Sequence, residues 1–220
     1  MATYVLIHGA GDSAFYWHLV APELEERGSE VVAIDLPCED ESAGLAEYAD
    51  TVDEAIGDRT GLILVGQSFG GFTAPLVCAR RPVELIVLIA GMIPLPGEKG
   101  DDWPANSGYP GSAAGADGEL ALFYHDVPPA LAAEALARGR GQAEAPGRQP
   151  WPLDSWPDVP TRYLLCRDDR LFPASWMRGV VRERLGIEPD EIDGGHCPAL
   201  SRPGDLSERL EMYRAELGIR

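Results

Sequence analysis

Short apolar runs recur along the chain, and stretches with apolar residues at helical spacing separate them. Such runs, when bounded by Gly, Pro and acidic residues, are typical of buried β-strands. We expect strands at residues 4–7, 30–34, 62–65, 85–89, 162–166 and 188–192. Helical spacing is clearest at 45–56 and at 206–217. Strands separated by helices predict right-handed crossovers, and therefore a three-layer α/β fold with a six-stranded parallel sheet.

This alternation of strand and helix patterns is interrupted between residues 92 and 158. The first half of that segment is rich in Pro and Gly, a helical stretch follows at 129–138, and two Trp-Pro pairs close it. Structureless loops of such length are uncommon and usually functional. We therefore expect a core of residues 1–91 and 159–220, with an inserted lid or cap at 92–158. Residues 97–118 offer little apolar area to offset the entropy of ordering, so we expect them to be mobile and to gate the site. The alternative is a solvated excursion without function.

A buried-type strand runs directly into a G-x-S-x-G pattern at residues 66–70, Gly-Gln-Ser-Phe-Gly. In this pattern a serine stands at a sharp strand-to-helix turn, and small residues two positions before and after it let the strand and the helix approach each other. Gly66 and Gly70 meet that need, and a helix-compatible stretch follows at 69–81. The pattern predicts that Ser68 is a nucleophile. The alternative is a Gly-rich turn with an inert serine.

Partners for such a serine are expected after later strands, because ligands bind outside the carboxyl ends of an open parallel sheet. Asp168 and Asp169 follow the strand at 162–166, and His196 follows the last strand in a Gly-rich loop. The order Ser, Asp, His is the expected one. His196 is the predicted general base, and Asp169 is the predicted acid because it lies further out of its strand than Asp168, which stays the alternative.

An oxyanion hole requires backbone N–H groups that point at the developing charge. Phe69 supplies one, and Ala10, in the small-residue turn after the first strand, supplies the other. His8 is expected to hold that turn by hydrogen bonds. Candidates for apolar pocket walls are Phe15, Met92, Phe123 and Phe172, although each could equally pack in the core. His18 and His125 are interpreted first as ordinary structural histidines.

Charge narrows the range of partners. The formal net charge of -18, from 36 acidic and 18 basic residues, repels phosphate backbones and anionic membranes, so we expect neither nucleic acid nor a membrane as partner. The first residues lack a basic region with a long apolar stretch, so a cytoplasmic protein is expected. Four cysteines without C-x-x-C spacing predict reduced thiols and no metal site.

Taken together, these residues resemble the α/β-hydrolase superfamily, in the branch that holds small-ester esterases, plant-type methylesterases and hydroxynitrile lyases. The resemblance rests on His8-Gly9-Ala10 through Trp17, Arg27-Gly28, Ala33-Ile34-Asp35-Leu36-Pro37, Gly194-Gly195-His196 and Leu200-Ser201-Arg202-Pro203. It spans about residues 3–91 and 160–217 and carries the same roles onto Ser68, Asp169, His196, Ala10 and Phe69. Larger members have two leading antiparallel strands. Because the first strand here begins almost at Met1, we expect a wholly parallel sheet.

The resemblance implies a serine hydrolase that cleaves carboxylic esters of small molecules through an acyl-enzyme, without metal or cofactor. A thioesterase or a carbon-carbon bond hydrolase or lyase would use the same residues. In the lyases a threonine and a lysine stand where this chain has Gly9 and Cys197, which disfavours lyase activity. A ligand receptor on the same fold is a further alternative, since fold does not fix function. The expected partner is a small ester substrate, with homodimerisation left open.

Overall fold

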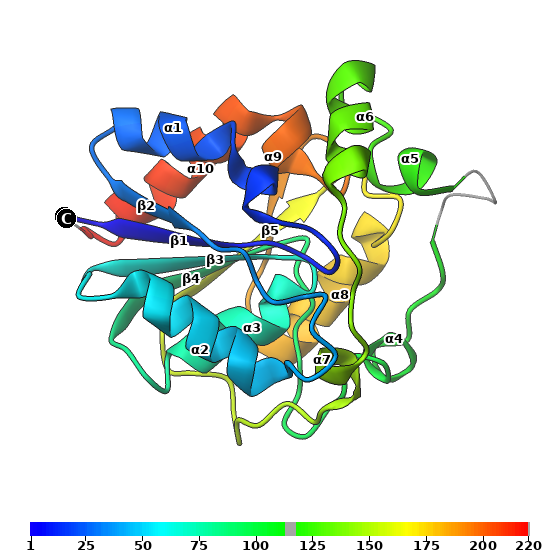
Figure 1. Ribbon diagram of the computed structural model, residues 1–220, viewed down its shortest axis with the longest axis horizontal. Coiled ribbons are helices and arrows are strands. Elements are labelled where there is room, and N and C mark those ends of the chain that lie inside the picture. Colours follow the sequence, from blue (N-terminus) through cyan, green and yellow to red (C-terminus); the bar gives the residue numbers. More distant parts are fainter. Residues whose placement is uncertain (113–117, 220) are drawn as a thin grey trace.

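The computed structural model describes residues 1–112 and 118–219, and a six-stranded parallel sheet forms its centre (Figure 1). The strands are β1 (Thr3–Ile7), β2 (Glu30–Ala33), β3 (Leu62–Gln67), β4 (Val83–Ile89), β5 (Thr161–Cys166) and β6 (Asp190–Ile192). Their order is β2-β1-β3-β4-β5-β6, and every neighbouring pair is parallel. The predicted α/β fold class and the wholly parallel sheet are confirmed.

Helices cover both faces of this sheet. One layer holds η1 (Ala14–Trp17), α1 (Val20–Glu26), α9 (Pro198–Ser201) and α10 (Pro203–Glu216), and the other holds α2 (Leu45–Ile56), α3 (Gly70–Val77) and α8 (Ala174–Leu185) (Figure 1). Successive side chains of a strand point to opposite faces. In β1, Tyr4 and Leu6 therefore join the cluster under the first layer, whereas Val5 and Ile7 join a cluster under the second. Burial on both faces explains why the central strands β1, β3 and β4 are largely continuous apolar runs.

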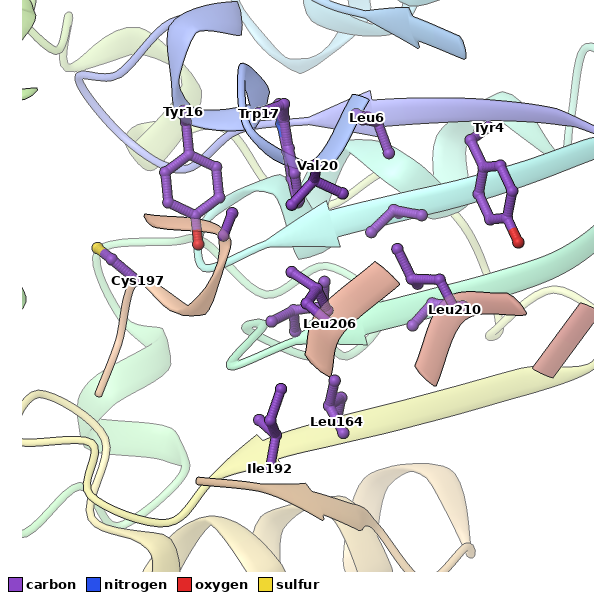
Figure 2. Close-up of a cluster of buried hydrophobic side chains, with 14 of the residues drawn as sticks. Tyr4, Leu6, Tyr16, Trp17, Val20, Leu164, Ile192, Cys197, Leu206 and Leu210 are labelled. Carbon is purple, nitrogen blue, oxygen red and sulfur yellow. The ribbon is translucent and has the colours of Figure 1, made fainter. Parts of the chain in front are cut away.

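Figure 2 shows the core beneath α10. Leu206 and Leu210 lie one turn apart on that helix and face Leu164 and Ile192 of the sheet. All four are buried. Burial of a leucine side chain contributes roughly 1.5–3 kcal/mol, so this row of contacts accounts for the helical spacing in the last part of the sequence.

Several element boundaries differ from the expectation by a few residues, and proline contributes to two of these differences. The helix expected at 69–81 is α3, which ends at Val77 and contains Pro75, a residue that cannot donate a backbone hydrogen bond. Residues beyond it continue only as turns. β6 begins at Asp190 and not at residue 188, because Pro189 has no N–H to donate to the sheet.

The segment between β4 and β5 contains α4 (Trp103–Asn106), α5 (Gly118–Phe123), α6 (Pro129–Arg138) and α7 (Ala145–Arg148). α6 confirms the helix expected at 129–138. In Figure 1, α5 and α6 lie beyond the ends of the strands, near α9. We call residues 92–158 the inserted segment. Its division from the core as a separate lid stays a prediction.

The first half of the inserted segment carries more apolar contact than the sequence indicates. Trp103 is fully buried, and its Nε1 donates to the carbonyl of Ile93 at 2.9 Å. The Tyr109 hydroxyl donates to the carbonyl of Leu171 at 2.7 Å, and Glu98 forms a buried ion pair with Arg184. The expectation that 97–118 has almost no apolar area is therefore wrong for 97–112, because a composition count cannot tell that one tryptophan is packed into the core. The remaining part of that expectation, 113–117, lies outside the described residues.

Candidate active site

Ser68 lies at the turn from β3 to α3 in a left-handed backbone conformation, with φ of 49°. This conformation costs a non-glycine residue about 1–2 kcal/mol. Backbone hydrogen bonds hold it: the Ser68 N–H donates to Ile89, and its carbonyl accepts from Gly71 and Met92. Strained residues of this kind are retained where the surroundings fix them, and they cluster at functional sites.

Glycines make this turn sterically feasible. A Cβ at Gly66 would lie 2.9 Å from the carbonyl oxygen of Gly70, and a Cβ at Gly70 would lie 2.9 Å from the carbonyl oxygens of both Ile7 and His8. Real Cβ atoms do not approach backbone oxygens so closely, so β3, α3 and the end of β1 can meet only if both positions lack side chains. The requirement for small residues before and after Ser68 is confirmed.

Asp169 and His196 form a buried hydrogen-bonded pair. His196 Nδ1 lies 2.8 Å from Asp169 Oδ2, and the other carboxylate oxygen accepts from the backbone N–H groups of Leu171 at 2.8 Å and Phe172 at 2.9 Å. The carboxylate is therefore fixed, and Nδ1 carries the donated proton. His196 Nε2 then has a free lone pair, and it is buried without a hydrogen-bond partner in the described part of the chain. It lines the same cavity as Ser68.

Asp168 has a different place in the structure. Its backbone N–H donates to the Gly194 carbonyl at 3.0 Å, and its Oδ2 accepts from the Gly194 N–H at 3.2 Å. Arg167 donates to Ile192 in the same manner, so the pairing with β6 continues through Asp168. Asp169 is the first residue beyond that pairing. The structure therefore brings Asp169, and not Asp168, to the imidazole.

The two predicted oxyanion donors, Ala10 and Phe69, line the cavity together with Ser68. Neither backbone N–H donates to any residue that the structure describes. The turn that carries Ala10 is held by His8, whose Nδ1 donates to the Gly9 carbonyl at 2.7 Å and whose Nε2 accepts from the Leu36 N–H at 3.1 Å. Burial lowers the pKa of His8 to about 4, so its ring is neutral near pH 7.

The cavity has a volume of about 660 Å³ and is lined by both apolar and polar side chains. The apolar ones include Phe69, Met92, Phe123, Tyr124, Leu136, Leu171 and Phe172, and the polar ones include Asp12, Glu119, Arg140 and Gln142. Met92, Phe123 and Phe172 thus lie where the sequence predicts pocket walls. Phe15 does not line the cavity, which corrects the expectation: its ring stacks on His18 with ring centroids 4.1 Å apart, and Arg138 lies over it.

Sequence reasoning missed several of these cavity residues. Asp12 lies two positions beyond Ala10, is half-buried, and has its pKa raised to about 6 by burial. Arg140 and Gln142 come from the inserted segment and reach the turn after β1, where Gln142 accepts from the Gly11 N–H at 3.0 Å. No local sequence motif predicts long-range contacts of this kind. For Asp12, its position two residues after Ala10 is a signal from which a place in the cavity could have been inferred.

Among the described residues, no group of three or more His, Cys, Asp or Glu side chains could hold a metal ion. Within the same residues, no helix has both the length and the apolar character needed to cross a membrane.

Several curated proteins are similar to the chain over nearly its whole length. Norfluorocurarine synthase 1 from a Strychnos species is 24% identical, with 94% of this chain and 93% of that protein aligned. Two proteins of Arabidopsis thaliana also match: methylesterase 9 at 23% identity, covering 96% of this chain and 97% of that one, and alpha-hydroxynitrile lyase at 24% identity, covering 94% and 95%.

Among solved structures, an extracellular alpha/beta-hydrolase from a Paenibacillus species superimposes with a TM-score of 0.82 at 21% identity, over 96% of this chain and 98% of that one. The resemblance inferred from the sequence motifs is confirmed by these relatives. The model of the alpha/beta hydrolase family matches residues 4–209. The chain belongs to the alpha/beta hydrolase family.

Proposed function

We propose that the protein is a serine hydrolase that cleaves carboxylic esters of small molecules. One observation carries the proposal: the strained Ser68 and His196 line one cavity, and the buried Asp169 binds Nδ1 of His196, which leaves its Nε2 free as the proton acceptor. This constellation fits a nucleophile, a base and an orienting acid. The esterases among its relatives support the same reaction class.

In the proposed reaction, Ser68 Oγ attacks the ester carbonyl carbon while His196 Nε2 takes the hydroxyl proton. The carbonyl oxygen becomes an oxyanion, and the N–H groups of Ala10 and Phe69 stabilise it. The imidazolium then gives its proton to the leaving alcohol, and an acyl-Ser68 ester remains. Water, deprotonated by His196, attacks that ester, and the carboxylic acid leaves as Ser68 regains its proton.

The inserted segment contributes Phe123, Tyr124 and Leu136 to the cavity. We propose that it acts as a lid that shapes the site for the acyl or alcohol group. Lyase activity is disfavoured, because Cys197 follows His196 where the lyases carry lysine, and burial keeps its thiol neutral by raising its pKa. We further propose a cytoplasmic location, supported by the absence of disulfides among the four described cysteines.

The test is to label the protein with a fluorophosphonate and to measure turnover of nitrophenyl and methyl esters of increasing acyl length. We expect stoichiometric labelling and rapid turnover, and Ser68→Ala should abolish both while the fold is kept. The exposed Ser155 offers a control, and Ser155→Ala should behave like the parent. Activity of Ser68→Ala within about tenfold of the parent would reject the mechanism. Labelling of Ser68 without turnover of any ester or thioester would favour a ligand receptor.

A further inference from the structure

The loop that carries His196 is covered by two neighbouring residues of the inserted segment, His125 and Asp126. A Cβ at Gly195 would lie 2.6 Å from His125 Nε2 and 2.8 Å from Asp126 Oδ1, and a Cβ at Gly194 would lie 2.8 Å from Asp126 Oδ2. A side chain at either glycine would therefore push His125 or Asp126 away from the histidine loop. The sequence alone gives no reason for the second glycine.

Polar contacts accompany this close packing. Asp126 Oδ2 accepts from the Gly195 N–H at 2.8 Å, and His125 Nε2 donates to the Asp168 carbonyl at 3.0 Å. The inserted segment therefore holds both the loop of the histidine and the loop of its acid. From the end of β3, Gln67 Nε2 donates to the His196 carbonyl at 3.2 Å. Gly195, directly before His196, is thus bonded to the inserted segment, whereas the His196 carbonyl is bonded to β3.

The second oxygen of Asp126 is informative. Asp126 Oδ1 is buried and has no hydrogen-bond partner in the described part of the chain. A buried carboxylate oxygen left without a partner costs free energy, and apolar residues of similar size often replace such groups at no loss of stability. Stability alone therefore gives a weak reason for an aspartate here. A stronger reason for an aspartate is that the nearby imidazole of His196 must be held in one position.

We propose that Asp126 is a positioning residue for His196: its carboxylate fixes the Gly194-Gly195 turn and so makes the geometry of the base depend on the inserted segment. Phe123 of the same segment also contacts the imidazole, with ring centroids 5.6 Å apart. If the Asp126 carboxylate moves away, the Gly195 N–H loses its acceptor. The backbone directly before His196 is then no longer held in place, and the imidazole ring can shift. The kinetic part of this proposal rests on the proposed ester hydrolysis.

The test uses three variants of the full-length chain. Asp126→Leu keeps the size of the side chain and removes its acceptor oxygens, Asp126→Asn keeps an acceptor oxygen for the Gly195 N–H, and Asp126→Ala removes the whole contact. The control is Glu134→Ala, an exposed carboxylate on α6 that pairs only with Arg138 among the described residues. Displacements of about 1 Å at a reacting group can cost about 100-fold in rate. We expect kcat to fall by about tenfold or more in the Leu and Ala variants, with KM within about threefold.

The Asn variant and the control should retain most of the parental kcat. A second readout is the downfield proton NMR resonance of His196 Nδ1–H, with the rate of phosphonylation of Ser68 as a third. We expect the resonance to shift or broaden and labelling to slow in Asp126→Leu, with its melting temperature unchanged or raised. Unchanged kcat, resonance and labelling rate in a folded Asp126→Leu protein would overturn the proposal.

These readouts separate the two proposals. If the parent hydrolyses no ester, ester hydrolysis as the function fails, while the resonance and the phosphonylation rate still decide the role of Asp126. If the parent is active and Asp126→Leu behaves like it in all three measurements, the positioning role alone fails. If Asp126→Ala does not fold, the Leu and Asn variants carry the comparison.

Discussion

The carboxylate of Asp169 sets the protonation of the imidazole through the fixed direction of its two oxygens. Because Oδ1 is bound by the N–H groups of Leu171 and Phe172, only Oδ2 can face His196 Nδ1. The proton therefore stays on Nδ1 and the lone pair on Nε2. One residue thus selects the tautomer that a general base requires.

This arrangement predicts a large difference between neighbouring substitutions. In Asp169→Asn the amide oxygen should stay with the two N–H groups, so the amide N–H would face Nδ1 and force the proton onto Nε2. We expect kcat for ester hydrolysis to fall by as much as about 10⁴-fold. Asp168→Asn keeps the pairing with Gly194 through its backbone and should stay within about tenfold of the parent. Steady-state kinetics of the two variants decide this, and losses of equal size would move the acid to another residue.

His8 predicts an acid-sensitive contribution to stability. Burial lowers its pKa in the folded protein to about 4, whereas the unfolded chain keeps the ordinary value of about 6.5. Between these values the unfolded chain binds more protons, so the free energy of unfolding falls as the pH drops from about 6.5 towards 4. The full loss is of order 3 kcal/mol.

Urea unfolding at pH 7 and at pH 4.5 measures this effect. His8→Gln cannot titrate and should show a smaller difference between the two pH values than the parent. The variant will be less stable at pH 7, where the ring of His8 holds Gly9 and Leu36. An equal difference in parent and variant would assign the acid sensitivity to other groups.

At the scale of elements, the contact between β3, α3 and the end of β1 depends on missing side chains. Gly70→Ala would place a methyl group 2.9 Å from two backbone oxygens, neither of which can turn aside as a side chain can. We expect a loss of stability of about 1–3 kcal/mol and a fall in activity, since Ser68 shares this turn. The matched control is Gly179→Ala on α8, where no atom lies within 4 Å of the added methyl. Thermal melts of both variants would reject the steric account if their shifts were alike.

Element positions followed from the sequence where burial leaves a pattern. The central strands β1, β3 and β4 are buried apolar runs and could be located for that reason, and glycine spacing marks the turn at Ser68. Phe15 shows a limit, because a four-residue 3-10 helix has no periodicity from which to infer its orientation. Asp126 shows another: its partner Gly195 lies 69 positions away, and no local pattern predicts that contact.

At the scale of the molecule, the inserted segment is joined to the core by buried contacts as well as by chain connectivity. Arg184 of α8 forms an ion pair with Glu98, donates to the Ile93 carbonyl, and lies near the face of the Trp103 ring. Both charged side chains are almost completely buried, at 4% and 3% exposure. The front of the inserted segment is therefore part of the packed structure on the α8 side of the sheet.

This ion pair predicts how the segment and the core unfold. Glu98→Ala would leave the Arg184 guanidinium buried without its carboxylate, and the removal of one partner of a buried pair costs about 3–5 kcal/mol. The exposed pair of Glu134 and Arg138 is the control, and Glu134→Ala should cost less than about 1 kcal/mol.

Hydrogen exchange with peptide resolution shows in which part of the chain the stability is lost. In the parent, residues 97–112 should be protected, and in Glu98→Ala they should exchange early while β3 and β4 stay protected. Early exchange of 97–112 in the parent would mean that these buried contacts do not hold the segment in solution.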